Sequence, residues 1–162
     1  MNYTHKMLVE IARKWAFNRH GVAVAEFVCM NGEIADVMAF SSVYSTMIEC
    51  KISRSDFLAD KKKFFRRSPE FGMGNYRIYC APRGVITESD LPDKWALLEV
   101  YEGKARLNVN IYKYDQKSIF WHEPTDYLRL SERRVLYSIA RRAQIKGLMP
   151  KICETLLEVQ NV

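Results

Sequence analysis

Three consecutive strand-like segments constrain the fold of this chain most strongly. They cover residues 22–30, 34–40 and 44–52, and they are rich in small, aliphatic and β-branched residues. Only turn signals separate them, Asn31-Gly32 first and Ser41-Ser42 second. Because Asn-Gly favours a tight hairpin, the second segment is expected to return beside the first. The chain is therefore predicted to contain at least part of a sheet built from sequential strands.

Helical patterns lie on both sides of these strands. Apolar residues at positions 7, 8, 11, 12 and 15 predict a helix over 7–17. Ser53 and Asp56 have the form of a capping box, which predicts a second helix running to Arg67. Further elements are expected downstream: a strand over 76–80, a hairpin of 95–101 and 105–114 turning at Glu102-Gly103, and a helix over 131–146 that Ser131 caps and Gly147 ends.

Length and composition indicate one globular domain over residues 1–162. Hydrophobic residues make up 48% of the 162 positions, which is enough to bury a core. The longest uncharged run, 37–48, is interrupted by hydroxyl residues, and no apolar block opens the chain. We therefore expect no membrane span, no signal peptide and a cytoplasmic protein. Cysteines at 29, 50, 80 and 153 form no CxxC pair, which argues against a zinc site and a disulfide framework.

Positive charge is concentrated in two segments. The formal net charge is +6, yet residues 51–67 alone hold seven basic and two acidic side chains. Residues 129–146 hold six basic and one acidic side chain. Such a distribution is expected of a surface that meets a polyanion, although two solvated helix faces would give the same pattern.

Two carboxylates and a lysine form the strongest chemical pattern in the sequence. Side chains alternate along a strand, so Glu49 and Lys51 share one face about 6.5 Å apart. Asp36 lies on the preceding strand and is expected beside Glu49. Two neighbouring carboxylates in apolar surroundings are costly unless a cation joins them, and oxygen donors favour Mg²⁺ or Mn²⁺. The backbone carbonyl of Cys50 is a third candidate ligand. Alternatively, Asp36 caps a turn, and Glu49 and Lys51 form an exposed ion pair on an edge strand.

The spacing of Asp36 and Glu49-Cys50-Lys51 resembles the signature of the PD-(D/E)XK nuclease superfamily. The predicted order of helix, three strands, helix and strand resembles its common core, over about residues 5–102, with 103–162 as C-terminal additions. Residues 48–61, 72–77, 80–84 and 91–92 are similar to the small bacterial and phage branch that includes MmcB-like DNA-repair proteins. Ala35 stands where the proline of the motif's name would be.

This resemblance implies an α/β, restriction-endonuclease-like fold: a mixed central sheet flanked by helices, with a C-terminal hairpin and helix. It implies Asp36 and Glu49 as metal ligands, Lys51 as the catalytic lysine, and Glu10 or Glu26 as further acids. The implied activity is Mg²⁺- or Mn²⁺-dependent hydrolysis of DNA in repair, recombination or phage DNA metabolism. Members that cut both strands are often homodimers. The runner-up is a DNA-binding module that keeps the fold without useful catalysis, and a third alternative is a structural protein with simple surface acids.

Two helices carry the expected contacts with nucleic acid. On the second, Asp60 and Lys63 either pair within the helix or lie at the rim of the site. The last helix either contacts DNA through its arginines or packs through an apolar face. Candidate phosphate-binding residues, all in the first basic segment, are Arg54, Lys61, Lys62, Lys63, Arg66 and Arg67.

Overall fold

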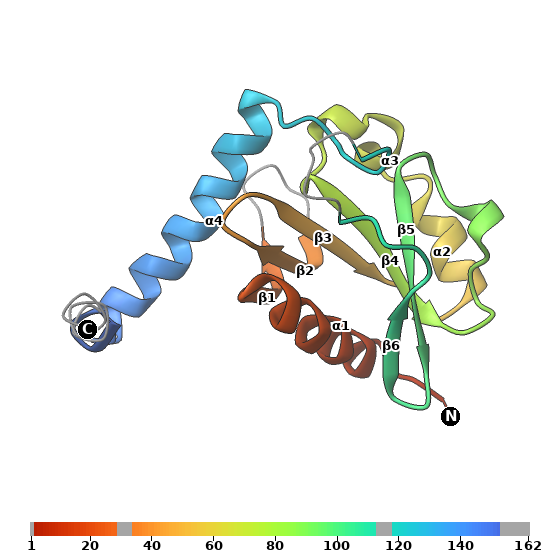
Figure 1. Ribbon diagram of the computed structural model, residues 1–162, viewed down its shortest axis with the longest axis horizontal. Helices are drawn as coiled ribbons and strands as arrows, with labels where there is room; N and C mark the ends of the chain where they lie inside the picture. Colours follow the sequence, from red (N-terminus) through yellow and green to blue (C-terminus); the bar gives the residue numbers. More distant parts are fainter. Residues whose placement is uncertain (1, 29–33, 113–117, 153–162) are drawn as a thin grey trace.

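A six-stranded mixed sheet forms the centre of the molecule (Figure 1). The protein is described by a computed structural model that covers residues 2–28, 34–112 and 118–152. The strands lie in chain order across the sheet, and the β3–β4 and β4–β5 pairs are parallel whereas the other pairs are antiparallel. Their bounds are β1 (Val22–Val28), β2 (Ile34–Phe40), β3 (Ser45–Cys50), β4 (Tyr76–Pro82), β5 (Trp95–Tyr101) and β6 (Lys104–Leu107). The protein is therefore of the α/β class, as the sequence predicts.

Because β3, β4 and β5 run parallel, their carboxyl ends lie next to one another. The return from β3 to β4 contains α2 (Arg54–Asp60), α3 (Phe64–Arg67) and the short 3₁₀ turn η1 (Pro69–Phe71). A second 3₁₀ turn, η2 (Glu88–Asp90), lies between β4 and β5. Just past β3, the amide of Lys51 donates to the carbonyl of Cys80 over 2.8 Å, so the pairing continues to the residue that the sequence singles out.

The helix α1 (His5–His20) covers one face of the sheet. Thr4 caps it, because its hydroxyl accepts the amide of Met7 at 3.3 Å. Leu8, Ala12 and Ala16 recur at helical spacing and are fully buried. They pack in one apolar cluster with inward-facing residues of the sheet: Val37, Ala39, Ile48, Cys50, Ile78, Cys80, Ala96 and Leu98.

The opposite face packs against α2 and the first half of α4 (Asp126–Ile145). Thr125 caps α4 by accepting the amide of Leu128 at 3.2 Å. The predicted cap at Ser131 is wrong, because that residue is buried one and a half turns inside the helix. Leu128 and Val135 fasten the first half to the core, whereas the second half extends away from the sheet (Figure 1). The packing alternative therefore holds for the first half.

The predicted helix from Ser53 to Arg67 is wrong as a single element. Ser53 does cap α2, accepting the amide of Asp56 at 3.2 Å, but α2 ends at Asp60 and α3 begins at Phe64. The break comes at Lys63, whose backbone is extended (φ −63°, ψ 147°), although its amide still donates to the backbone carbonyl of Asp60 over 2.9 Å. The turn matters for the site because it brings residues of α3 back towards Asp60.

Most other predicted elements are confirmed. The second strand and the first strand of the late hairpin have the predicted bounds, and Glu102-Gly103 forms the turn between β5 and β6. β6 is shorter than predicted and ends at Leu107. The Asn31-Gly32 turn lies outside the described residues. Within the described ranges, no helix is both long and apolar enough to cross a bilayer.

Candidate functional site

Glu49 and Lys51 are buried side by side where β3 ends. Met47 belongs to the apolar cluster under α2, and Ile48 belongs to the cluster under α1, so the predicted alternation of side chains is confirmed. Glu49 is 1% exposed and Lys51 is 5% exposed. Because β3 lies inside the sheet and both side chains are buried, the alternative of an exposed ion pair on an edge strand is wrong.

Lys51 lies between two carboxylates. Its Nζ is 3.0 Å from Glu49 Oε2 and 3.1 Å from Asp60 Oδ1. Asp60 comes from the end of α2, and the sequence places it at best on the rim, yet it is only 2% exposed. Tyr79 on β4 fixes it by donating its hydroxyl to Asp60 Oδ2 over 2.7 Å. Asp60 therefore holds the Lys51 ammonium together with Glu49.

Two further cations complete the cluster. Arg66 Nε lies 2.7 Å from Asp60 Oδ2, and its guanidinium reaches Glu49 Oε1 at 3.1 Å. The Nζ of Lys63 is 2.7 Å from Asp60 Oδ1 and 3.6 Å from Glu49 Oε2. The charge cluster, defined as Glu49, Lys51, Asp60, Lys63 and Arg66, thus contains two acids and three cations. The predicted pair of Asp60 and Lys63 forms, but Lys63 lies past the end of α2, and Asp60 also binds Lys51 and Arg66.

The pKa values in the charge cluster shift in different directions. Burial raises the pKa of Glu49, and the opposing pull of Arg66 and Lys51 does not cancel this effect. Burial acts the same way on Asp60, but there Arg66 and Lys51 outweigh it and the pKa falls well below its usual value. The pKa of Lys51 is raised, because Glu49 and Asp60 outweigh the effect of burying the ammonium. Lys51 is consequently protonated and acts as a hydrogen-bond donor.

Asp36 lies next to the charge cluster and contacts the backbone of β3. The pairing of Val37 with Ile48 places Asp36 beside Glu49 in the order of the two strands. Its Oδ2 accepts the amide of Cys50 at 2.7 Å, and its Oδ1 lies 3.3 Å from Nε2 of His5. The turn-capping alternative for Asp36 is therefore wrong. The structure brings Asp36 to the strand that carries Glu49, as predicted.

His5 is the neighbour that the sequence did not indicate. It is the first residue of α1 and about two-fifths exposed, and it is separated from Asp36 by a hairpin and a helix in the chain. No local motif links the two residues, because only the packing of α1 across the sheet brings them together. The charged residues Lys51 and Glu49 were visible as a motif, whereas His5 required the tertiary fold.

The other two acids that are predicted as metal ligands are Glu10 and Glu26. Glu10 pairs on its own helix with Arg13, at 2.9 Å, and with Lys14, at 3.6 Å. Glu26 is exposed on β1, across from Asp36, with a left-handed backbone (φ 49°). Within the described ranges, no three His, Cys, Asp or Glu side chains gather closely enough to form a metal site.

The predicted phosphate-binding residues divide into three groups. Arg66 and Lys63 belong to the charge cluster, and Arg66 also lies over the ring of Trp95 at 4.8 Å. Arg54 pairs with Asp90 of η2, with its Nη2 2.6 Å from Oδ1. Three others are exposed to solvent beside the cluster: Lys61, Lys62 and Arg67.

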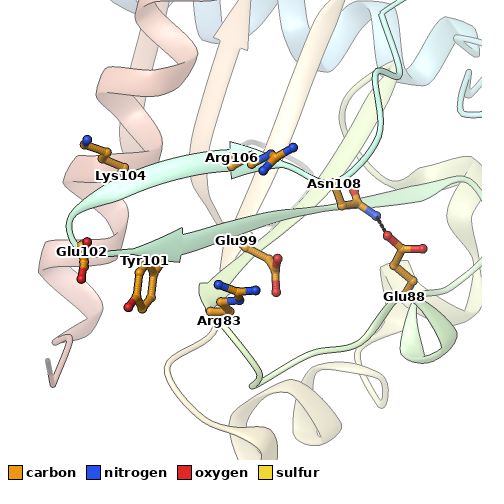
Figure 2. Close-up of a pocket in the computed structure, with 8 residues that line it drawn as sticks. All are labelled: Arg83, Glu88, Glu99, Tyr101, Glu102, Lys104, Arg106 and Asn108. Atoms are coloured by element: carbon orange, nitrogen blue, oxygen red, sulfur yellow. Dashed lines mark hydrogen bonds between the residues drawn. The ribbon is translucent and has the colours of Figure 1, made fainter.

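A separate open pocket of about 390 Å³ lies over the β5–β6 hairpin (Figure 2). Three acids and three bases line it together with Tyr101 and Asn108, and Asn108 bonds Glu88 at 3.0 Å. The formal charges of its lining residues balance. It does not contain the residues of the charge cluster.

Comparisons with known proteins show the fold and no activity. No family model matches the chain, and no curated protein matches it. A solved structure of a protein of unknown function from Silicibacter pomeroyi is similar, with a TM-score of 0.63 and 22% sequence identity. The similarity covers 89% of this chain and 92% of that one, so both share an arrangement of helices and strands over nearly their whole length.

Proposed function

We propose that this protein is a divalent-metal-dependent nuclease with a restriction-endonuclease-like core that hydrolyses phosphodiester bonds in DNA. One observation carries the proposal: Glu49 and Lys51 are buried together at the end of a central strand, and Asp36 contacts that strand from the next one. An ion pair on the surface would not require either side chain to be buried. Placing two acids and an ammonium together where the central strands end costs free energy of folding, which points to a functional reason for keeping them there.

The donor chemistry of these residues fits a hard divalent cation. Glu49 Oε1 and Asp60 Oδ1 are buried oxygens whose close partners are cations, Arg66 at 3.1 Å for Glu49 and Lys63 at 2.7 Å for Asp60. Carboxylate oxygens of Asp36 and Glu49, with the carbonyl of Cys50, would hold Mg²⁺ or Mn²⁺. When bound, the ion would polarise the scissile phosphate and lower the pKa of a water molecule.

Lys51 would stabilise negative charge on the reacting phosphate. Its raised pKa keeps it protonated at neutral pH, so it donates hydrogen bonds and does not act as a base. Glu49 and Asp60 hold its ammonium from two sides, which fixes its position before substrate arrives. The exposed cations Lys61, Lys62 and Arg67 would bind flanking phosphates of the DNA.

The test is cleavage of a panel of single-stranded, duplex, flapped and branched DNA, with Mn²⁺ and with a chelator. We expect cleavage with Mn²⁺, none with chelator, and none in Glu49→Gln. The matched control is Glu132→Gln, which neutralises a half-buried acid outside the charge cluster and should cut like wild type. Metal-independent cleavage, or full activity in Glu49→Gln, would contradict the assignment.

A second candidate is a DNA-binding module without catalysis. The observation that favours it is the composition of the charge cluster, where three cations already compensate two acids without any metal. In this case DNA binds to the basic surface and the charge cluster only stabilises the fold. Binding that weakens with salt, with no cleavage of any DNA in the panel, would identify this function.

A further inference from the structure

Lys63 differs from the other two cations of the charge cluster in its exposure. The side chains of Lys51 and Arg66 are 6% and 3% exposed, whereas that of Lys63 is 51% exposed. Lys63 follows the turn after α2, and its ammonium reaches back to Asp60 and Glu49 from the solvent side. It is therefore the cation that can leave at least cost, because water can solvate its ammonium again.

Lys63 also adds charge that the two buried acids do not need. Glu49 and Asp60 carry two negative charges, and the buried Lys51 and Arg66 carry two positive ones. If a divalent cation bound Glu49 while the Lys63 ammonium stayed in place, the ion would join three other cations around that carboxylate, of which Lys63 is the one open to solvent. Their repulsion would oppose metal binding.

We propose that Lys63 occupies the outer cation position between Asp60 and Glu49 in the metal-free protein, and that a divalent cation displaces it. This inference rests on the proposed function and deepens it. The released ammonium moves into solvent at the mouth of the site, where an entering phosphodiester can pair with it. Asp60 then loses its contact with Lys63 and continues to hold Lys51 and Arg66.

The other two cations, Arg66 and Lys51, are less suited than Lys63 to leave the charge cluster. Arg66 bonds Asp60, reaches Glu49 and lies over the ring of Trp95. Removing it would uncover both acids and lose the stacking contact. Lys51 contacts both acids from inside, so its departure would leave them without their innermost cation.

The experiment is calorimetric titration of the intact protein with Mn²⁺ in the absence of DNA. Lys63→Met removes the competing ammonium and keeps a long side chain, so Mn²⁺ should bind about three- to fivefold more tightly than to wild type. Lys63→Arg keeps the positive charge and should bind about as wild type does. Lys62→Met is the matched control, because it removes a neighbouring exposed charge and reports the general field alone.

Thermal unfolding of each variant verifies that the fold is kept. Equal Mn²⁺ affinity in wild type and Lys63→Met would overturn the displacement and leave the proposed function standing. The same tightening in Lys62→Met as in Lys63→Met would also overturn it, because the effect would then be one of net charge. If Mn²⁺ binds to none of these proteins, the proposed function fails and the displacement fails with it.

Discussion

Two buried polar clusters lie at opposite ends of β3, and they compensate their acids differently. At the amino end, Glu132 of α4 meets neutral donors: it accepts the Ser45 hydroxyl and, at 3.3 Å, the amide of Gly74. Asn75 completes this neutral cluster by accepting the amide of Ser45 at 3.0 Å. At the carboxyl end, the charge cluster surrounds its acids with cations.

The difference appears in the pKa values. Burial raises the pKa of Glu132, and the hydrogen bonds from Ser45 and Gly74, together with the charge of Arg77, do not offset it. Asp60 shows the opposite result, because Arg66 and Lys51 outweigh burial. At the amino end of β3, hydrogen bonds from neutral groups attach α4 to the sheet. At the carboxyl end of β3, the cations of the charge cluster keep the buried acid Asp60 ionised. The half-buried Glu132 thus serves packing, whereas the buried Asp60 maintains a charged arrangement suited to chemistry.

The largest expected effect is the loss of the Asp60 charge. Asp60→Asn leaves Lys51, Lys63 and Arg66 with a single carboxylate, so about 3 kcal/mol of the free energy of unfolding should be lost at neutral pH. Urea denaturation measures it. The low folded pKa of Asp60 stabilises the protein above its usual value of 3.8, and this contribution disappears as the pH falls below that value.

Asp56→Asn is the matched control for this prediction. Asp56 lies one turn earlier on α2 and accepts the exposed amide of Ile52 at 3.3 Å. Its change should cost under about 1 kcal/mol. A similar small loss in Asp60→Asn would mean that the charge cluster does not depend on Asp60, and the contrast between the two ends of β3 would be lost.

The next effect concerns rate. Lys51→Ala leaves Glu49 and Asp60 balanced by Arg66 and Lys63, so the fold should persist while cleavage slows by roughly 10²–10³. Single-turnover cleavage with saturating Mn²⁺ is the measurement. Ser45→Ala, at the other end of the same strand, should cut at the wild-type rate. Wild-type cleavage in Lys51→Ala would remove this lysine from the mechanism.

The sequence was sufficient to predict the local features of this site and insufficient for its distant ones. The alternation along β3 and the pairing of β2 with β3 follow from periodicity and turn residues, so Glu49, Lys51 and Asp36 could be placed. The position of Arg66 could not be predicted, because it depends on the turn before α3 in a segment that has helical composition throughout. Tyr79 and His5 reach the site only through strand pairing and helix packing, for which the sequence has no local signal.

The smallest expected effect tests the amino end of β3. Glu132→Gln should keep the contacts of the neutral cluster, because the amide oxygen can still accept from Ser45 and Gly74. At pH 7 the variant should be as stable as wild type or up to about 1 kcal/mol more stable, since no charge is buried. Because the folded pKa of Glu132 is raised above 4.5, wild type gains stability as the pH falls towards that value and the difference should narrow. Urea denaturation of both proteins at pH 7 and pH 5 measures this, and the other acids cancel in the difference. A variant that is clearly less stable than wild type at pH 7 would show that the ionised carboxylate is the stabilising form, and the two ends of β3 would then compensate their acids alike.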